Sequence, residues 1–482
     1  MPRGKRIFYS ALMLTGVNLL RRFVGTSFQV YLSGRIGAAG IGLLQLVMSV
    51  GSLAMVAGMG GIRTAAMYLT AEELGKHRPA NVIWVLSGCF GYSIAFSGTV
   101  SLLLYLFAPQ IAQLWIGDVR TVDALRLYAA FLPCVCLCGV MTGYFTAANR
   151  IGTLAAVEVA EQLISMVITM TALTLWAGHS PVRACLTLSC LVLLRLREKA
   201  PTGRRISVAG RLQQTALPLA VADDLRTGIS TVENLMVPKR LALCTLVEDP
   251  LAAFGTVSGM VFPVLMFPAC ILYGLAELLI PELARCAAAD SRQRISYLVR
   301  RSLKVAMLYG VFFCGLIYLL ADRLCLSLYQ SSEAGYYLRL YSLLIPMLYC
   351  DAVTDAMTKG LGQQKICVRY NILTNILDVI FLYLLLPNYG MMGYFVSFLV
   401  THLLNFILSL RRLLKITGER IPFHVPSLSI AALILAIWIA GHVENPVLQA
   451  ALFPVILGCM LYLLKITGKE DIRWLKNLIL RQ

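Results

Sequence analysis

Two adjacent arginines interrupt an apolar run near the start of the chain, in the stretch NLLRRFVGTSF at residues 18–28. Only fourteen uncharged residues separate Arg6 from Arg21, and only twelve separate Arg22 from Arg35. A membrane-spanning helix needs about 20 predominantly apolar residues, so a span placed here must contain at least one arginine. A guanidinium stays charged in a dry site and offers phosphate oxygens a planar fork. The alternatives are that Arg22 pairs with a buried carboxylate or extends to the membrane surface.

Other ionisable side chains also lie within apolar segments. Arg63 follows a glycine-rich bend in GMGGIRTAAM, where it is either a second phosphate contact or a cation that reaches water near a helix kink. Glu233 lies two turns beyond Asp223, Asp224 and Arg226 in one apolar segment. Intramembrane charges of this kind predict a site rather than a lipid-facing surface.

A third group of charges has helical spacing. Asp351, Asp355 and Lys359 follow one another at intervals of four residues, which places them on one face of one helix. This face is either an intrahelical ladder of ion pairs or the lining of a cavity. Because charged groups facing lipid are very costly, we expect the cavity.

The composition indicates an integral membrane protein. Hydrophobic residues make up 59% of the 482 residues and charged residues 14%, with a mean hydropathy of +0.76. A soluble domain is about a quarter charged. The net charge of +18 lies between apolar segments, which favours anionic lipid headgroups over nucleic acid as the partner. The fourteen cysteines contain no CxxC pair and indicate small buried hydrophobes, and we expect no removed signal peptide.

Hydropathy predicts fourteen spans. They lie near residues 7–32, 41–70, 81–107, 122–147, 154–177, 181–196, 212–237, 251–280, 300–320, 335–359, 366–386, 390–410, 426–442 and 447–465. Alternate connections are rich in lysine and arginine, whereas the others are nearly free of them. This alternation predicts that both termini are cytoplasmic.

The sequence also contains a weak internal repeat. A shift of 213 residues places Gly42 on Gly255 and Pro133 on Pro346. Such a repeat predicts two bundles of six helices with parallel topology, and a substrate site between them. The expected divisions are residues 1–210, residues 211–420 and two additional helices with a tail at 421–482.

The second half of the chain resembles a known family. The stretches TVENLMVPKRL (231–241), GTVSGMVFPVLMFPACILYGLAELLIPELARC (255–286) and YLRLYSLLIPMLYCDAVTDAMTKGLGQQK (337–365) are similar to the stage V sporulation protein B family. That family belongs to the polysaccharide-exporter branch of the MOP superfamily, beside MATE exporters and MurJ lipid II flippases. The resemblance implies an all-α fold of two six-helix bundles in a V around a cavity, with two further helices. It also implies a flippase of undecaprenyl-diphosphate-linked oligosaccharide.

The resemblance extends to particular residues. Arg22, followed by two apolar residues and Gly25, matches an Arg-x-x-Gly motif whose arginine is proposed to meet the substrate diphosphate. A second first-span arginine of the lipid II group corresponds here to Phe28, and an eighth-span arginine has no counterpart, so the match is partial. The expected substrate-binding residues are Arg22, Arg21, Arg63, Glu233, Asp351, Asp355 and Lys359.

A sodium site is a further implication of the resemblance. Lipid II flippases have one built from spans seven, eleven and twelve, and hard cations take oxygen ligands. The corresponding set here is Asp224, Asn375, Asp378 and Thr401, with Asn371 nearby. By contrast, Glu158 and Glu161 are expected to cap a helix at the cytoplasmic end, and His402 is expected to be a packed histidine.

No enzyme motif is present in the sequence: it lacks a P-loop, HExxH and GxSxG. We therefore expect a transporter without a cofactor, driven by a sodium or proton gradient, the membrane potential or the lipid gradient. The hypothesis is an alternating-access flippase in the bacterial cytoplasmic membrane, acting in cell-wall synthesis or sporulation. Its expected partners are the lipid-linked glycan, anionic lipids and cell-wall synthesis enzymes. The alternatives are a MATE-type drug/cation antiporter and a non-transporting scaffold.

Overall fold

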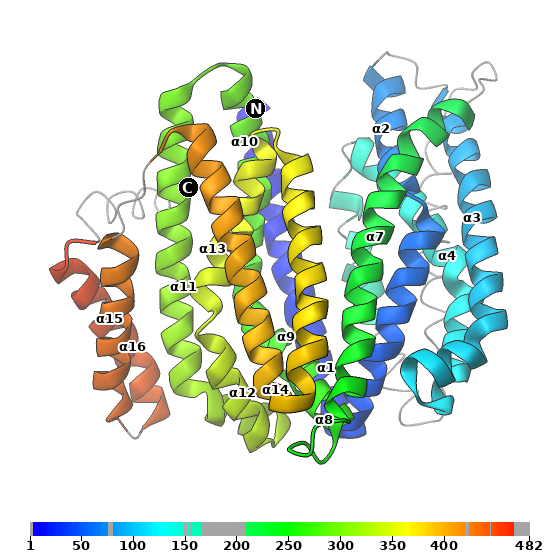
Figure 1. Cartoon of the computed structure of the whole chain (residues 1–482). Helices are drawn as coiled ribbons and strands as arrows, with labels where there is room; N and C mark the ends of the chain where they lie inside the picture. The colour runs from blue at the N-terminus through cyan, green and yellow to red at the C-terminus, as the bar shows by residue number, and fades with distance from the viewer. Residues whose placement is uncertain are drawn as a thin grey trace. The chain divides into compact units, whose positions relative to one another are not determined.

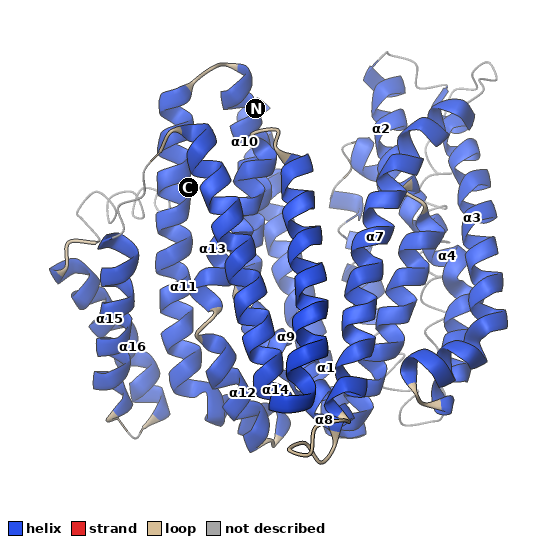
Figure 2. Ribbon diagram, in the orientation of Figure 1, coloured by secondary structure: helices blue, strands red, loops and turns tan. Residues whose placement is uncertain are grey.

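The computed structural model describes residues 3–75, 81–148, 150, 152–154, 156–157, 159–164, 209–419, 424–443 and 445–466. Throughout these residues the backbone is helical with short turns and contains no strand (Figure 2). The all-α class predicted from the sequence is confirmed. The predicted span near 181–196 lies outside the described residues, as does most of the span near 154–177.

The helices follow one another along the chain as labelled in Figure 1. They are α1 (Arg3–Met59), α2 (Ile62–Gly75), α3 (Val82–Gln110), the π-helical turn η2 (Ile111–Ile116), the 3₁₀ turn η3 (Val119–Thr121), α4 (Val122–Ala147), α7 (Ala209–Leu241), α8 (Pro250–Gly255), the π-helical turn η4 (Thr256–Val261), α9 (Phe262–Met266), α10 (Ala269–Ala288), α11 (Arg292–Tyr329), α12 (Ser332–Ser342), α13 (Ile345–Gly360), α14 (Gln364–Thr417), α15 (His424–Gly441) and α16 (Pro446–Leu463).

Several of these helices have the length and composition of membrane spans. Among the described residues six qualify, and a seventh is added if the bent pair Pro250–Met266 and Ala269–Ala276 forms one span. A helix satisfies its backbone donors and acceptors within the segment, as is required in hydrocarbon, which offers no hydrogen bonds. A multi-pass membrane protein is therefore confirmed, while the count of fourteen spans stays a prediction.

Two of the predicted connections coincide with helix breaks. The predicted connection at 33–40 contains Gly37, with φ 70° and ψ 178°, where α1 divides into two helices. The predicted connection at 387–389 lies directly before Gly390, with φ 55° and ψ −136°, where α14 divides into two helices. Glycine adopts positive φ at little cost, so the chain turns without a polar loop.

Conversely, the predicted span at 251–280 is broken between α9 and α10, with a bend of 63°. Pro268 lies at this break and supplies no backbone N–H. Two tyrosines satisfy carbonyl groups there: Tyr309 Oη donates to the Pro268 carbonyl at 2.8 Å, and Tyr349 Oη donates to the Leu265 carbonyl at 3.0 Å. These bonds replace helical bonds that the bend removes.

The chain divides into two compact units. The first comprises Met1–Gln29, Ala38–Gly255 and Leu382–Gly390, and the second comprises Val30–Gly37, Thr256–Phe381 and Met391–Gln482. The first unit thus contains α7 and α8, whose residues are predicted to belong to the second bundle. The boundaries predicted from the repeat stay a prediction.

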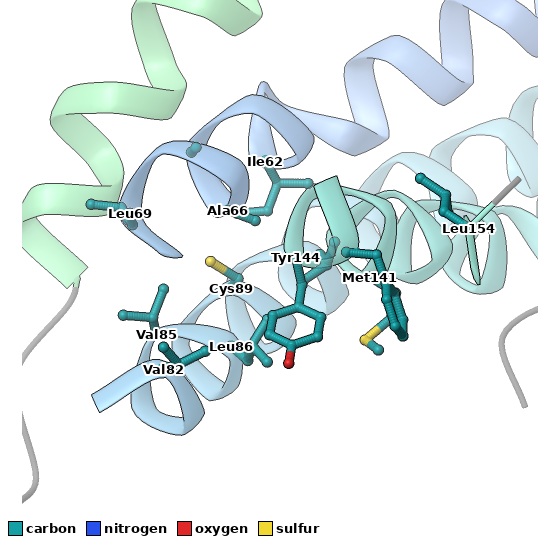
Figure 3. Packing of buried hydrophobic residues seen from close by; sticks show 13 residues of the cluster. Ile62, Ala66, Leu69, Val82, Val85, Leu86, Cys89, Met141, Tyr144 and Leu154 are labelled. Atoms are coloured by element: carbon teal, nitrogen blue, oxygen red, sulfur yellow. The ribbon is translucent and has the colours of Figure 1, made fainter. Parts of the chain in front are cut away.

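The first unit has a core formed by α2, α3 and α4. Figure 3 shows Ile62 and Ala66 of α2, Leu86 of α3 and Met141 of α4 among the buried side chains of this cluster. The helices approach closely because α4 carries Gly143, where a Cβ atom would lie 2.5 Å from the Arg63 carbonyl oxygen. This packing fixes the first turn of α2, which carries the Arg63 side chain.

Two glycines permit a tight crossing of α1 and α8 in the first unit. A Cβ atom on Gly255 would overlap the carbonyl oxygen of Ala38 and lie 2.6 Å from the nitrogen of Gly42. A Cβ atom on Gly42 would in turn overlap the carbonyl oxygen of Leu251. The obstructing atoms belong to the backbone, so a side chain at either glycine requires the helices to separate.

This crossing predicts opposite effects for two Gly→Ala substitutions. Gly255→Ala should destabilise the protein by about 1–3 kcal/mol, the usual cost of overpacking. Gly98→Ala, in α3, meets no atom within 4 Å and should be neutral or stabilising, because alanine favours helix more than glycine does. Thermal unfolding of the purified variants in detergent measures both. An unfolding temperature for Gly255→Ala equal to or above that of Gly98→Ala would contradict the tight crossing.

Candidate functional site

The two arginines of α1 have different surroundings. Arg21 is partly buried, and its carbonyl oxygen accepts a hydrogen bond from Nε2 of Gln162 at 2.8 Å. Gly25, one turn later, leaves room for the same amide, since its Cβ would lie 3.1 Å from Gln162 Nε2. Arg22 is rotated by about 100° from Arg21 around the helix and is exposed. Gly25 therefore belongs to the packed face, and Arg22 lies outside it.

The Arg22 guanidinium makes no hydrogen bond or ion pair within the described part of the chain. The alternative in which Arg22 pairs with a buried carboxylate finds no support among these residues. An unpaired guanidinium followed by twelve uncharged residues, in a helix where only Arg21 separates it from fourteen preceding uncharged residues, is free to receive an anionic ligand.

Arg63, also in the first unit, is exposed like Arg22. It lies in the first turn of α2, directly after Gly60 and Gly61, which both adopt positive φ (47° and 69°). The predicted glycine-rich bend before Arg63 is confirmed. Tyr92 Oη of α3 donates to the Gly60 carbonyl at 3.4 Å and so supports the break.

Polar side chains connect α7 to α1 in the same unit. Asn234 Nδ2 donates to Ser49 Oγ at 3.1 Å, and Thr231 Oγ1 donates to the Ser49 carbonyl at 3.2 Å. Glu233 lies between these two residues and is partly buried. Asp224, two turns earlier on α7, is close enough to Tyr92 for an electrostatic interaction. Asp224 of α7 and the Tyr92 hydroxyl of α3 therefore lie near the α1–α2 break, whereas Thr231 and Asn234 of α7 contact α1 ten residues before its end.

In the second unit, the charged face of α13 separates into two different sites. Lys359 Nζ forms an ion pair with Asp355 Oδ2 at 2.6 Å, so part of the expected intrahelical ladder exists. Asp351 has no cation within ion-pair distance among the described residues. Its carboxylate instead accepts hydrogen bonds from Asn405 Nδ2 of α14, at 3.1 and 3.4 Å to the two oxygens.

Asp378 forms a second carboxylate site in this unit. It is 3% exposed and accepts hydrogen bonds from Ser397 Oγ at 2.5 Å and Thr401 Oγ1 at 3.1 Å. The structure thus brings together two of the predicted sodium ligands, Asp378 and Thr401, and adds Ser397. Asn375 is partly buried and makes no hydrogen bond to Asp378.

The remaining predicted ligand, Asp224, belongs to the first unit, so the complete set of four stays a prediction. The described residues contain no group of three or more His, Cys, Asp or Glu side chains arranged to hold a metal ion. His402 stacks on Phe398 with ring centroids 3.8 Å apart, as expected for a packed histidine. Glu158 lies outside the described residues, and Glu161 is partly buried.

Sequence reasoning missed Ser397 and Asn405. A signal for both was available, because buried polar residues recur at every fourth position of α14: Ser397, Thr401, Asn405 and Ser409. Four-residue spacing places them in one row on the helix. In an apolar helix such a row indicates that carboxylates or other polar partners lie opposite it.

Comparisons with known proteins agree with this fold. Residues 241–384 match the MatE family model. The chain is 22% identical over 464 residues to stage V sporulation protein B of Bacillus subtilis (strain 168), covering 90% of this chain and 88% of that protein. The resemblance identified in the sequence is therefore confirmed.

Solved structures give the same result. A lipid II flippase MurJ in an inward closed conformation is similar over 94% of this chain and 100% of its own, with a TM-score of 0.69 and 14% identity. An inward-facing multidrug resistance MATE family transporter of the MOP superfamily is similar over 83% of this chain and 94% of its own, with a TM-score of 0.66 and 15% identity. The chain has the fold of MOP-superfamily transporters, and these similar proteins are transporters and flippases rather than enzymes.

The Asp355–Lys359 pair predicts a measurable coupling. Asp355→Asn or Lys359→Met alone should lower stability, because each leaves a partly desolvated charge without its partner. The double variant should lose less than the sum of the two. Both side chains are partly exposed, at 24% and 32%, so we expect a coupling on the order of 1 kcal/mol. Thermal unfolding of the four proteins measures this coupling. Strict additivity would contradict the pair.

Proposed function

We propose that this protein carries a polyprenyl-diphosphate-linked oligosaccharide, a precursor of cell wall or polysaccharide, across the bacterial cytoplasmic membrane by alternating access. The observation on which the proposal rests is the exposed, unpaired guanidinium of Arg22 within a long apolar helix. A diphosphate is the part of such a substrate that most requires a counter-charge in a medium of low dielectric constant. Arg22 supplies that charge with the fork geometry that phosphate oxygens match.

The first unit offers further groups for the polar part of the substrate. Arg63 is exposed in the first turn of α2, where the positive end of the helix dipole adds to its charge. The proposed set also includes Arg21 and Glu233 of the first unit. It is completed by the α13 face of the second unit, with Asp351, Asp355 and Lys359. The polyprenyl tail would remain in lipid while the headgroup crosses, so binding requires only a cationic and hydrogen-bonding lining.

Two of the comparisons support this substrate class. The similarity to stage V sporulation protein B extends over nearly the whole chain, and one similar structure is a lipid II flippase. Anionic lipids are the proposed surface partners, and cell-wall synthesis enzymes the proposed protein partners. Basic residues in alternate connections support cytoplasmic termini.

A coupling cation is proposed at Asp378. Its carboxylate and the hydroxyl oxygens of Ser397 and Thr401 are hard oxygen donors within one buried cluster, as sodium prefers. Sodium entry would neutralise a carboxylate that is otherwise held only by neutral groups.

A second candidate function is a MATE-type drug/cation antiporter. The match of residues 241–384 to the MatE family model favours it. Export of organic cations would require an acidic, aromatic-lined site, whereas the exposed charges Arg22 and Arg63 have the opposite sign. Exchange of organic cations for sodium or protons by the reconstituted protein, with no lipid-linked glycan bound, would favour the antiporter.

Arg22 provides the first test of the proposed function. If it binds a diphosphate through two parallel hydrogen bonds, activity should fall in the order Arg, Lys, then Gln and Ala. Loss of one charge-assisted bond costs about 1.5–3 kcal/mol, which corresponds to roughly 10- to 150-fold weaker binding. Native mass spectrometry of polyprenyl-diphosphate glycan bound to each variant, beside flipping in vesicles, gives the two readouts.

Arg292→Gln is the matched control, because Arg292 is 90% exposed and pairs only with the equally exposed Asp290. It should leave glycan binding unchanged. Folded Arg22→Ala protein that retains full glycan binding and flipping would refute the assignment of Arg22, and surface expression separates this outcome from misfolding.

Asp378 predicts the sodium response. Sodium chloride should raise the unfolding temperature of the wild-type protein relative to potassium chloride, because a ligand that binds only the native state stabilises it. Asp378→Asn should abolish this difference. An equal sodium effect in both proteins would exclude Asp378 as a ligand, whatever the transported substrate is.

A further inference from the structure

Asp351 and Asn405 form a pair with an incomplete set of hydrogen bonds. Asn405 Nδ2 donates to both oxygens of Asp351, at 3.1 and 3.4 Å, so the amide of α14 faces the carboxylate of α13. Asn405 is only 8% exposed, yet its Oδ1 atom is buried without any hydrogen-bond partner. A buried polar atom without a partner costs about 1–3 kcal/mol and requires an explanation.

The charge of Asp351 is also uncompensated. The described charged groups that act on it are Asp355 and Lys359 of its own helix. Lys359 is bound to Asp355 at 2.6 Å, which leaves its charge largely committed to that pair. Of the other helices packed against α13, α10 and α11 place no described charged side chain against Asp351, and α14 supplies the neutral Asn405.

One proton resolves both deficits. An ionised carboxylate only accepts hydrogen bonds, whereas a protonated carboxyl also donates one. The new O–H of Asp351 can donate to Asn405 Oδ1 while Asn405 Nδ2 donates to the other carboxyl oxygen. The result is a closed, neutral acid–amide pair in which every polar atom facing the partner is satisfied.

We propose that Asp351 is a proton-binding group whose protonated form is completed by Asn405. A hydronium ion transfers one proton to a carboxylate oxygen and becomes water, which changes the charge of the site from −1 to zero. This site is distinct from the sodium site at Asp378. It requires no assumption about the transported molecule, so it goes beyond the proposed function.

The row of buried polar residues on α14 leads from Asn405 towards the charged end of that helix. From Asn405 the row continues through Ser409 towards Arg412, whose Nη2 donates to Gln363 Oε1 at 2.6 Å. Seven residues of helix separate Asn405 from Arg412, a rise of about 10 Å. Asp351 therefore contacts α14 at a point about 10 Å along the helix from Arg412.

The proton state also has a structural consequence. A neutral acid–amide pair tolerates an apolar environment, whereas the ionised pair requires water or a cation. Protonation should therefore close the contact between α13 and α14, and proton release should favour its hydration. This is the kind of two-state element that a proton gradient can bias.

Infrared difference spectroscopy of the full chain in lipid provides the test. The wild-type protein should show a protonated carboxyl C=O band at low pH that disappears as pH rises. Asp351→Asn should lose this band. Asp355→Asn is the matched control: Asp355 lies one turn away and is paired with Lys359, so this variant should keep the band. Asn405→Leu should lose the band at lower pH than the wild type, because the amide oxygen that accepts the carboxyl O–H is gone.

Two results would overturn the proposal. One is a band of unchanged intensity in folded Asp351→Asn. The other, which applies even if that variant fails to fold, is an Asn405→Leu band that disappears at the same pH as in the wild type or at a higher pH. The spectra are recorded without substrate. They therefore test the proton site even if the proposal of glycan transport proves wrong.

Discussion

Hydrocarbon supplies neither hydrogen bonds nor counter-charges, and this constraint determines where polar groups occur in the protein. Many polar groups of the described helices find partners within the chain: Tyr309 satisfies the carbonyl of Pro268, and Lys359 neutralises Asp355. Against this background the exceptions carry the functional information. Arg22 has charge without a partner, and Asn405 has an acceptor without a donor. The unpaired charge of Arg22 suits an anionic ligand, whereas the unpaired acceptor of Asn405 suits a proton on Asp351. The kind of partner that is missing therefore distinguishes the two proposed roles.

The face on which charged residues lie could be predicted from the sequence, whereas their hydrogen-bond partners could not. Helical periodicity alone placed Asp351, Asp355 and Lys359 on one face, because this requires only the geometry of a single helix. The partner of Asp351 is 54 residues away on another helix, and no local pattern specifies such a pairing. The four-residue row on α14 showed that a polar partner was needed, but it did not identify that partner. Resemblance to relatives gave Thr401 for Asp378 but missed Ser397, which also binds that carboxylate.

Helix breaks were predicted only in part. Hydropathy detects polar interruptions, and the connections that it predicted at 33–40 and 387–389 coincide with the helix breaks at Gly37 and Gly390. It did not detect the bend at Pro268, because that bend lies within an apolar segment where tyrosine hydroxyl groups far along the chain satisfy the freed carbonyl groups. The weak repeat was more informative at the level of packing. The shift of 213 residues exchanges Ala38 with Leu251 and Gly42 with Gly255, and the overlaps at the α1–α8 crossing are exchanged in the same way. Reciprocal contacts of this type are what a two-fold arrangement produces.

The two carboxylate sites of the second unit depend on the same helix. Thr401 holds Asp378 and Asn405 holds Asp351, and these two α14 residues are one turn apart, a rise of about 6 Å. A helix transmits displacement along its axis, so a shift that releases Thr401 from Asp378 also moves the amide at Asp351. Any effect of cation binding on the proton affinity of Asp351 must then be matched by an equal effect of protonation on cation affinity, because linkage between two sites is reciprocal. The proposed proton and cation sites would therefore act as one coupled device, even though no atom is shared between them.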